Sequence, residues 1–139
     1  MDAVDHVVLG AGAVGTAVAE ALARRGEPVR LVNRSGLRQP MAGVQSVAGD
    51  VTDPVFAASA TRGARVVYQA LNPPYHRWAH EFPGLQAAAI AAAQTAGARL
   101  VAMDNVYMYG PPTDGRSPRT APTTRTLARA ASAPKWPVT

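Results

Sequence analysis

The stretch that decides the fold is His6-Val7-Val8-Leu9-Gly10-Ala11-Gly12-Ala13-Val14-Gly15. Its first four residues form a short apolar run that ends at a glycine, which is typical of a buried parallel strand. Apolar residues then recur at helical spacing from Ala13 to Leu22, and Gly26 supplies a stop signal. A strand, a glycine-rich turn and a helix therefore follow one another in the order that a dinucleotide-binding unit requires.

Each glycine of this turn has its own physical role in such a unit. Gly10 permits the tight turn, Gly12 lets the backbone approach a pyrophosphate, and Gly15 lets the helix pack against the strand. The free amides at the start of the helix, at Ala13 and Val14, and the positive end of the helix dipole favour an anion there. We expect all five residues to bind a dinucleotide cofactor, and the alternative is a glycine turn that binds nothing.

Strands and helices continue to alternate along the chain as far as Gly110. Strands are expected at Val29–Val32, Val44–Val47, Arg65–Gln69 and Arg99–Met103, and helices from Pro54 to about Arg62 and from about Phe82 to Ala96. Asp53 can cap the first of these helices, and Gly97 can end the second. This alternation predicts an α/β fold with a doubly wound parallel sheet, the Rossmann fold, in a single domain over residues 1–110.

Residues 111–139 differ in composition from the rest of the chain. Residues 1–110 carry nine Arg against eight Asp or Glu, whereas residues 111–139 carry five Arg or Lys against one Asp, so most of the formal net charge of +5 lies here. The segment is also too polar and too rich in proline to extend a sheet. We interpret it as an irregular basic tail, the remnant of a substrate-binding region lost through truncation or a shifted reading frame.

Composition and segment lengths exclude several classes of protein. The chain has no Cys, which excludes disulfides, thiolate metal sites and a Cys nucleophile. No apolar run approaches the ~18 residues that a membrane span needs, and the N-terminus lacks the pattern of a signal peptide. Trp136 is the one aromatic residue in the basic tail, too little for a nucleic-acid face. We therefore expect a cytoplasmic protein with no membrane or nucleic-acid partner.

The residues after the second expected strand bear on the choice of cofactor. An NAD site usually places an Asp or Glu about 20 residues after the glycine turn to hold the ribose hydroxyls. Here the chain reads Val32-Asn33-Arg34-Ser35-Gly36, without an acid. Arg34, with Arg38 nearby, could instead neutralise a 2′-phosphate. We expect NADP, with Asn33 and Arg34 in its site; the alternative is NAD, with Arg34 merely solvated.

Asp50 follows the third expected strand, at the carboxyl edge where such sheets bind ligands. Its carboxylate could accept a hydrogen bond from an adenine amino group, with Val51 beside the ring. It could equally serve only to stabilise the turn. The residues alone leave both roles open.

Five motifs together resemble a known family. They are Gly10-x-Gly12-x-x-Gly15, Asn33-Arg34, Gly49-Asp50-Val51-Thr52-Asp53, Asn72-Pro73-Pro74-Tyr75 and Asp104-Asn105-Val106-Tyr107-Met108-Tyr109-Gly110. Over residues 5–125 the chain is similar to the extended or atypical short-chain dehydrogenase/reductases, also called NAD-dependent epimerase/dehydratase-like proteins. The resemblance implies that Asp50 and Val51 contact adenine, and that Ala70, Leu71 and Asn72 line the cofactor path.

The chain departs from the catalytic pattern of that family. Members usually carry a Ser or Thr five residues before the Gly of a Tyr-Gly pair, and a Tyr-x-x-x-Lys motif about 20 residues later. Asn105 occupies the first position, no Tyr follows Tyr109, and the only Lys is Lys135. Asn105 and Tyr109 remain as catalytic candidates, and Tyr107 could also act as an acid. Packing under the next loop is the stronger interpretation for both tyrosines.

His76 and His80 have a spacing that can place two imidazoles on one helical face, with Glu81 as a third ligand. The pattern is not H-E-x-x-H and no Cys assists, so we expect that these residues flank a helix and that no metal is bound.

The leading functional hypothesis is an NADP-binding oxidoreductase or epimerase-like protein, represented by its cofactor-binding portion. One alternative is a regulator that senses NADP without turnover. Another is an inactive remnant whose exposed sheet edge is covered by self-association, as a homodimer. No motif identifies the small-molecule substrate.

Overall fold

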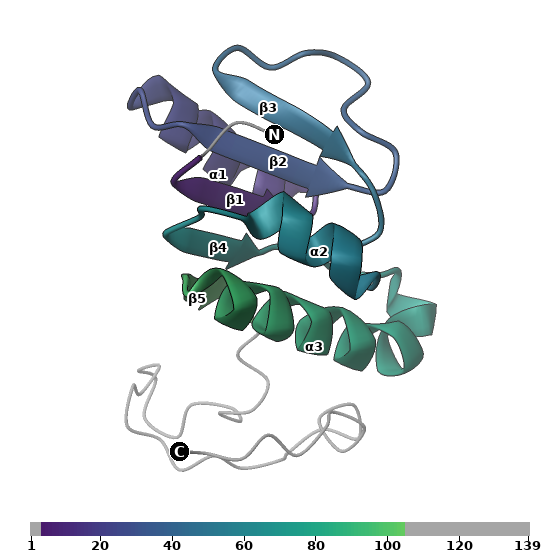
Figure 1. Ribbon diagram of the computed structural model, residues 1–139. Helices are drawn as coiled ribbons and strands as arrows, with labels where there is room; N and C mark the ends of the chain where they lie inside the picture. Colours follow the sequence, from purple (N-terminus) through teal and green to yellow (C-terminus); the bar gives the residue numbers. More distant parts are fainter. Residues whose placement is uncertain (1–3, 105–139) are drawn as a thin grey trace, which may run out of the picture. The chain divides into compact units, whose positions relative to one another are not determined.

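The computed structural model describes residues 4–104 of the chain. Strands and helices alternate along these residues (Figure 1). In chain order they are β1 (His6–Leu9), α1 (Ala13–Arg24), β2 (Val29–Asn33), β3 (Val44–Ala48), α2 (Pro54–Thr61), β4 (Val66–Gln69), the 3-10 helix η1 (Tyr75–Arg77), α3 (Trp78–Ala96) and β5 (Arg99–Ala102). The five strands form one sheet in the order β3-β2-β1-β4-β5, and every neighbouring pair is parallel. The doubly wound Rossmann sheet predicted from the sequence is confirmed.

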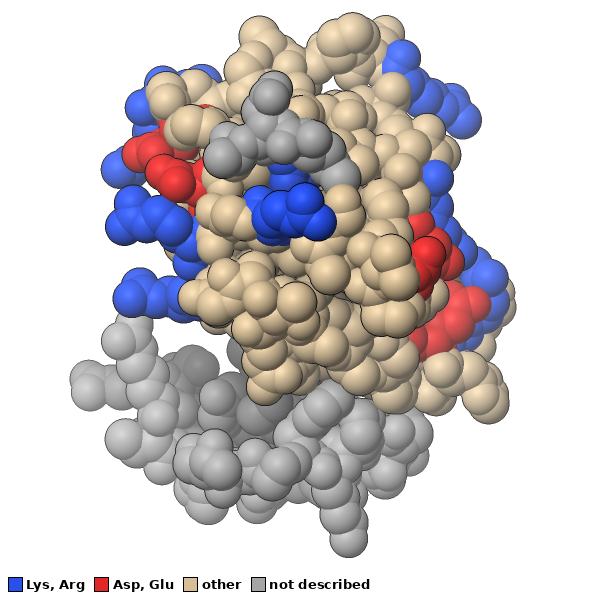
Figure 2. Space-filling model, in the orientation of Figure 1, with Lys and Arg blue, Asp and Glu red and all other residues tan. Residues whose placement is uncertain are grey.

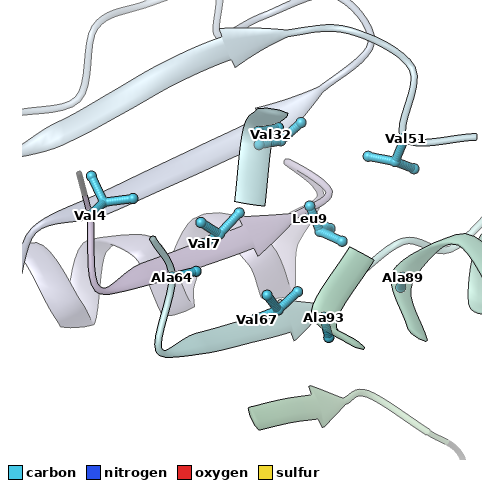
Figure 3. Packing of buried hydrophobic residues seen from close by; sticks show 10 residues of the cluster. Val4, Val7, Leu9, Val32, Val51, Ala64, Val67, Ala89 and Ala93 are labelled. Atoms are coloured by element: carbon cyan, nitrogen blue, oxygen red, sulfur yellow. The ribbon is translucent and has the colours of Figure 1, made fainter. Parts of the chain in front are cut away.

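Helices cover both faces of the sheet, with α2 and α3 on one face and α1 on the other (Figure 1). The larger buried apolar cluster includes Val7, Leu9 and Val67 from the strands and Ala89 and Ala93 from α3 (Figure 3). A smaller cluster on the side of α1 contains Val8, Ala19, Val29 and Leu31. Successive residues of β1 thus face opposite layers, which explains why its three buried residues, Val7, Val8 and Leu9, are all apolar. Each buried Val or Leu contributes about 1.5–3 kcal/mol.

The helix boundaries follow local signals in the sequence. Asp53 precedes α2, and its Oδ1 accepts hydrogen bonds from the amides of Val55 (2.9 Å) and Phe56 (3.4 Å). Pro54 occupies the first helical position, where its missing N–H costs nothing. Gly97 ends α3 in the left-handed conformation at φ 64°. These predicted start and stop signals are confirmed.

The start of α3 is where the sequence-based expectation is wrong. The helix begins at Trp78 rather than near Phe82, so Pro83 lies inside it. Two contacts between residues four apart support the additional turn. The rings of Trp78 and Phe82 stack at 4.5 Å between centroids, and Arg77 Nη1 lies 3.0 Å from Glu81 Oε1. Such side-chain pairs stabilise a helical turn and offset part of the cost of Pro83, which cannot donate the hydrogen bond to the carbonyl four residues before it.

Arg30 is the second residue of β2 and is fully buried, which was not predicted from the sequence. Its Nε donates a hydrogen bond to Gln45 Oε1 on β3 (2.7 Å), and its Nη1 donates one to the carbonyl of Ala60 in the last turn of α2 (2.6 Å). The guanidinium therefore joins two strands and a helix. A buried charge is tolerated only with such partners.

Within residues 4–104, none of the helices combines the length and the apolar character that crossing a membrane requires. The expected domain boundary at Gly110 and the predicted basic tail lie outside the described residues.

Candidate functional site

The carboxyl ends of the strands bring the glycine turn and the loop after β4 together. β1 pairs with β2 on one side and with β4 on the other, so the direction of chain winding reverses beside β1. The amide of Gly10 donates to the carbonyl of Val32 (2.8 Å), and the amide of Ala70 donates to that of Leu9 (2.8 Å). Ligands of open α/β sheets bind outside the carboxyl ends of the strands at this kind of reversal.

The three glycines of the turn occupy different surroundings. Gly10 has φ +105°, and a Cβ there would lie 2.8 Å from the carbonyl oxygen of Ala70. A Cβ on Gly15 would collide with the carbonyl oxygen of Gly10 and lie 3.3 Å from the Cβ of Ala70. A Cβ on Gly12 would meet no atom within 4 Å. Packing within the protein therefore requires the outer two glycines, whereas the space in front of Gly12 is open.

The N-terminus of α1 is open to a ligand. Gly12 is its N-cap residue and provides no side-chain hydrogen bond, in contrast to Asp53 at the start of α2. Val14 in the first turn is 40% exposed. The first amides of a helix need acceptors from outside the helix, and they attract anions.

Asn33 and Arg34 lie at the carboxyl end of β2. The Asn33 Nδ2 group donates to the carbonyl of Gly36 (3.2 Å), whereas its Oδ1 is buried and has no hydrogen-bond partner within residues 4–104. The Arg34 side chain is exposed, and its charge lowers the pKa of the Asp50 carboxyl. The end of β2 thus offers one unused acceptor and one cation.

Asp50 lies at the end of β3 and closes a local turn. Its Oδ1 accepts hydrogen bonds from the amide (2.9 Å) and the hydroxyl (2.8 Å) of Thr52. These bonds, together with the charge of Arg34, hold the pKa of Asp50 below its ordinary value, although desolvation acts in the opposite direction. The turn-forming role left open by the sequence is therefore present, and Asp50 is ionised near neutral pH.

The end of β4 is supported by a buried side chain. Gln69 is almost fully buried, and its Nε2 donates to the carbonyl of Leu71 (3.0 Å). Leu71 packs against the larger apolar cluster, and Asn72 next to it is exposed. The loop that carries Ala70, Leu71 and Asn72 is thus held at the edge of the sheet.

An open cavity of about 310 Å³ lies at the ends of β2, β3 and β4, beside the first turns of α3. The residues that line it are Asn33, Arg34, Gly49, Asp50, Val51, Thr52, Leu71, Asn72, Pro73, Pro74, Glu81, Gly84 and Leu85. Six predicted site residues, from three separate segments, are among them: Asn33, Arg34, Asp50, Val51, Leu71 and Asn72. The glycine turn and Ala70 do not line this cavity; Ala70 instead contacts the turn.

The wall of the cavity that α3 provides was not predicted from the sequence. Glu81, Gly84 and Leu85 project from the first turns of this helix. The one local signal for this wall is Gly84, directly after Pro83. A glycine inside a helix costs about 1 kcal/mol of helix stability relative to Ala, so it often indicates a packing or functional role.

Asn105, Tyr107 and Tyr109 lie outside the described residues. Within residues 4–104, the His, Asp and Glu side chains form no group of three that could hold a metal ion.

Figure 2 shows the charged side chains of the described part mainly at the two margins of the face that α2 and α3 cover. The margin on the side toward which the strands point carries both acidic and basic groups.

Several solved structures share this fold. The Bordetella bronchiseptica enzyme WbmH, solved with NAD+, superposes with a TM-score of 0.74 at 18% identity, over 94% of this chain and 50% of that one. Uronate dehydrogenase from Agrobacterium tumefaciens gives 0.71 at 21% identity, over 91% and 50%. A Rossmann-fold NAD(P)-binding family protein from Shigella flexneri gives 0.58 at 21% identity, over 70% and 50%. The chain spans about half the length of each of these proteins.

No match to the chain was found among curated proteins. A protein-family model described as NAD(P)H-binding matches residues 10–133, which is most of the chain and includes the glycine turn and the cavity. The match agrees with the Rossmann sheet, with the open glycine turn and with the fold of the neighbours. The chain is an NAD(P)-binding Rossmann domain and belongs to the NAD(P)H-binding family.

Proposed function

We propose that the chain binds NADP as the cofactor-binding portion of an oxidoreductase or epimerase-like protein. The observation that carries the proposal is the cavity of about 310 Å³ at the strand ends, lined by six residues that the sequence predicts for the cofactor site. Ligand pockets begin at about 300 Å³, so the volume suits one half of a dinucleotide.

The pyrophosphate would bind at the glycine turn. Gly12 leaves space for it, and the amides of Ala13, Val14 and Gly15 at the start of α1 are the donors. Gly10 and Gly15 keep the turn close to the loop at Ala70. The nicotinamide half would then extend past Ala70, away from the cavity that receives the adenosine.

The adenosine would occupy the cavity between the strand ends. Val51 and Leu71 supply apolar contacts to a ring, and Asn72 supplies a polar group. Asp50 can form its turn and bind adenine at once, because both of its hydrogen bonds within the described residues use Oδ1 and leave Oδ2 for a ligand.

The preference for NADP depends on Arg34. Within residues 4–104 this side chain has neither a hydrogen bond nor an ion pair within 4 Å, and it lies at the cavity beside the end of β2. A 2′-phosphate would provide its partner. The unused Oδ1 of Asn33 suits a ribose hydroxyl, which both cofactors have, so it does not distinguish them.

The test is a binding titration with NADPH and NADH, repeated for Arg34→Ala. We expect the substitution to weaken NADPH about tenfold or more and to leave NADH nearly unchanged, because only NADPH loses a charge-assisted hydrogen bond. Arg62→Ala is the matched control, since Arg62 is exposed at the end of α2 and does not line the cavity. Equal affinities for the two cofactors, unchanged by Arg34→Ala, would overturn the assignment to NADP.

A second candidate function is an NADP sensor without turnover. It is favoured by the sequence itself, in which Lys135 is the only Lys and no Tyr follows Tyr109, so no Tyr-x-x-x-Lys pair is present. Incubation with NADPH and a panel of carbonyl and sugar-nucleotide substrates separates the two. Protein-dependent oxidation of NADPH that Tyr109→Phe or Asn105→Ala reduces would favour the enzyme.

A further inference from the structure

Two carboxylates from different elements line the adenosine cavity. Asp50 follows β3, whereas Glu81 belongs to the first turns of α3. The proposed function assigns a role to Asp50 and none to Glu81. Both carboxylates line one cavity, so a ligand that presents hydrogen-bond donors to each would find an acceptor on both sides.

Both carboxylates are held through a single oxygen. Asp50 Oδ1 accepts the two bonds from Thr52, and Glu81 Oε1 pairs with Arg77 Nη1 at 3.0 Å. Within residues 4–104, no hydrogen bond or ion pair uses Asp50 Oδ2 or Glu81 Oε2. Each side chain is therefore held by a residue close to it in the sequence and retains one acceptor.

The ion pair between Arg77 and Glu81 is not explained by helix stability alone. Arg77 stands at the N-terminus of α3, where a cation opposes the helix dipole, and an acid is better placed before its basic partner than after it. The pair of Glu20 and Arg24 on α1 has the favourable order. Arg77 is thus better understood as a positioning residue that orients the Glu81 carboxylate.

The rest of the cavity suits a flat apolar group. Val51, Leu71 and Leu85 lie on its walls, and a Cβ added to Gly84 would meet no atom within 4 Å. The space in front of Gly84 is therefore open to a ring. A planar ring with an exocyclic amino group matches both the apolar walls and the two acceptors.

We propose that Glu81 reads the 6-amino group of the adenine together with Asp50, each carboxylate accepting one of its two N–H bonds. The inference rests on the proposed function, since it assumes that the cavity binds the adenosine of a dinucleotide. Hypoxanthine carries a carbonyl oxygen in place of the amino group, and two carboxylates would repel it. The cavity therefore selects an aminopurine over an oxopurine.

The experiment compares the binding of NADPH with that of its hypoxanthine analogue. We expect the unsubstituted protein to prefer NADPH by about tenfold or more, the effect of a hydrogen bond to a charged group. In Glu81→Gln the preference should fall to within about threefold, because the amide can donate to the carbonyl of hypoxanthine. Glu20→Gln, which breaks a comparable ion pair on α1, should keep the original preference.

Three results would contradict this inference. If Glu81→Gln keeps the preference of the unsubstituted protein, Glu81 does not contact the amino group. If the unsubstituted protein binds both dinucleotides equally, the cavity does not read the base, and the proposed cofactor function still stands. If it binds neither dinucleotide, both the inference and the proposed function are wrong.

Discussion

Replacing Gly12 with Val separates the ligand-binding role of the glycine turn from its role in folding. Gly12 has φ −75° and ψ −175°, an extended conformation that a β-branched residue adopts readily. The new Cβ would meet no protein atom within 4 Å. The side chain would instead fill the space through which a pyrophosphate approaches the amides of α1.

The two expected effects differ greatly in size. As an N-cap residue, Val should lower the free energy of unfolding by about 0.5–1 kcal/mol relative to Gly. Replacing Gly also reduces the conformational freedom of the unfolded chain, which should raise the free energy of unfolding by roughly 0.4–1 kcal/mol. The free energy of unfolding should therefore hardly change. Excluding the pyrophosphate removes about two charge-assisted hydrogen bonds, or about 3 kcal/mol, which corresponds to a loss of affinity of ~100-fold or more.

The assay combines calorimetric titration with NADPH and thermal unfolding without ligand. Gly15→Ala is the matched control, because its Cβ collides with the carbonyl oxygen of Gly10 and should lower the free energy of unfolding by about 1–3 kcal/mol. Undiminished NADPH binding by Gly12→Val would refute the idea that the pyrophosphate passes over Gly12. A large loss of stability in Gly12→Val would show that the space in front of it is not open.

Two further substitutions test the environments of single side chains. Arg30→Leu should lower the free energy of unfolding by about 3 kcal/mol, measured by urea denaturation, because Gln45 Oε1 and the carbonyl of Ala60 lose their buried donor. Thr52→Val should raise the pKa of Asp50 toward its ordinary value of 3.8, as followed by NMR titration, because the hydroxyl bond is lost while the amide bond stays. Since the folded pKa is the lower one, the stability advantage of the unsubstituted protein is present above pH 3.8 and disappears as the carboxyl protonates in acid. An advantage that grows on acidification would contradict this linkage.

Most of the fold could be predicted because its signals are local. The strand at His6–Leu9 ends at a glycine, and Asp53-Pro54 combines a cap with a residue suited to the first turn. These signals act within a few residues, so they do not depend on the rest of the chain. The observed strands differ from the expected ones by a residue at most.

The missed features depend on contacts between distant segments. The burial of Arg30 requires Gln45 and Ala60 to arrive from two other elements. Glu81 and Leu85 reach the cavity because α3 packs over the sheet, and that placement is decided by the buried alanines on its other turns, Ala89 and Ala93. This dependence on distant contacts also explains why only part of the cavity could be predicted from the sequence. Residues directly after a strand were found, whereas the wall contributed by a helix was not.

The start of α1 has no side-chain cap, so the stability of its first turn should depend on whether a ligand is bound. Asp53 completes α2 from within the chain, but the corresponding acceptor for α1 must come from solution. A bound dinucleotide would supply this acceptor, so binding of the ligand and ordering of the first turn of α1 would be thermodynamically linked. At a concentration of 100 times its Kd the ligand adds about 2.7 kcal/mol to stability, and hydrogen exchange at Ala13 and Val14 should slow in step. The cofactor would then take the place of the N-cap side chain that α1 lacks.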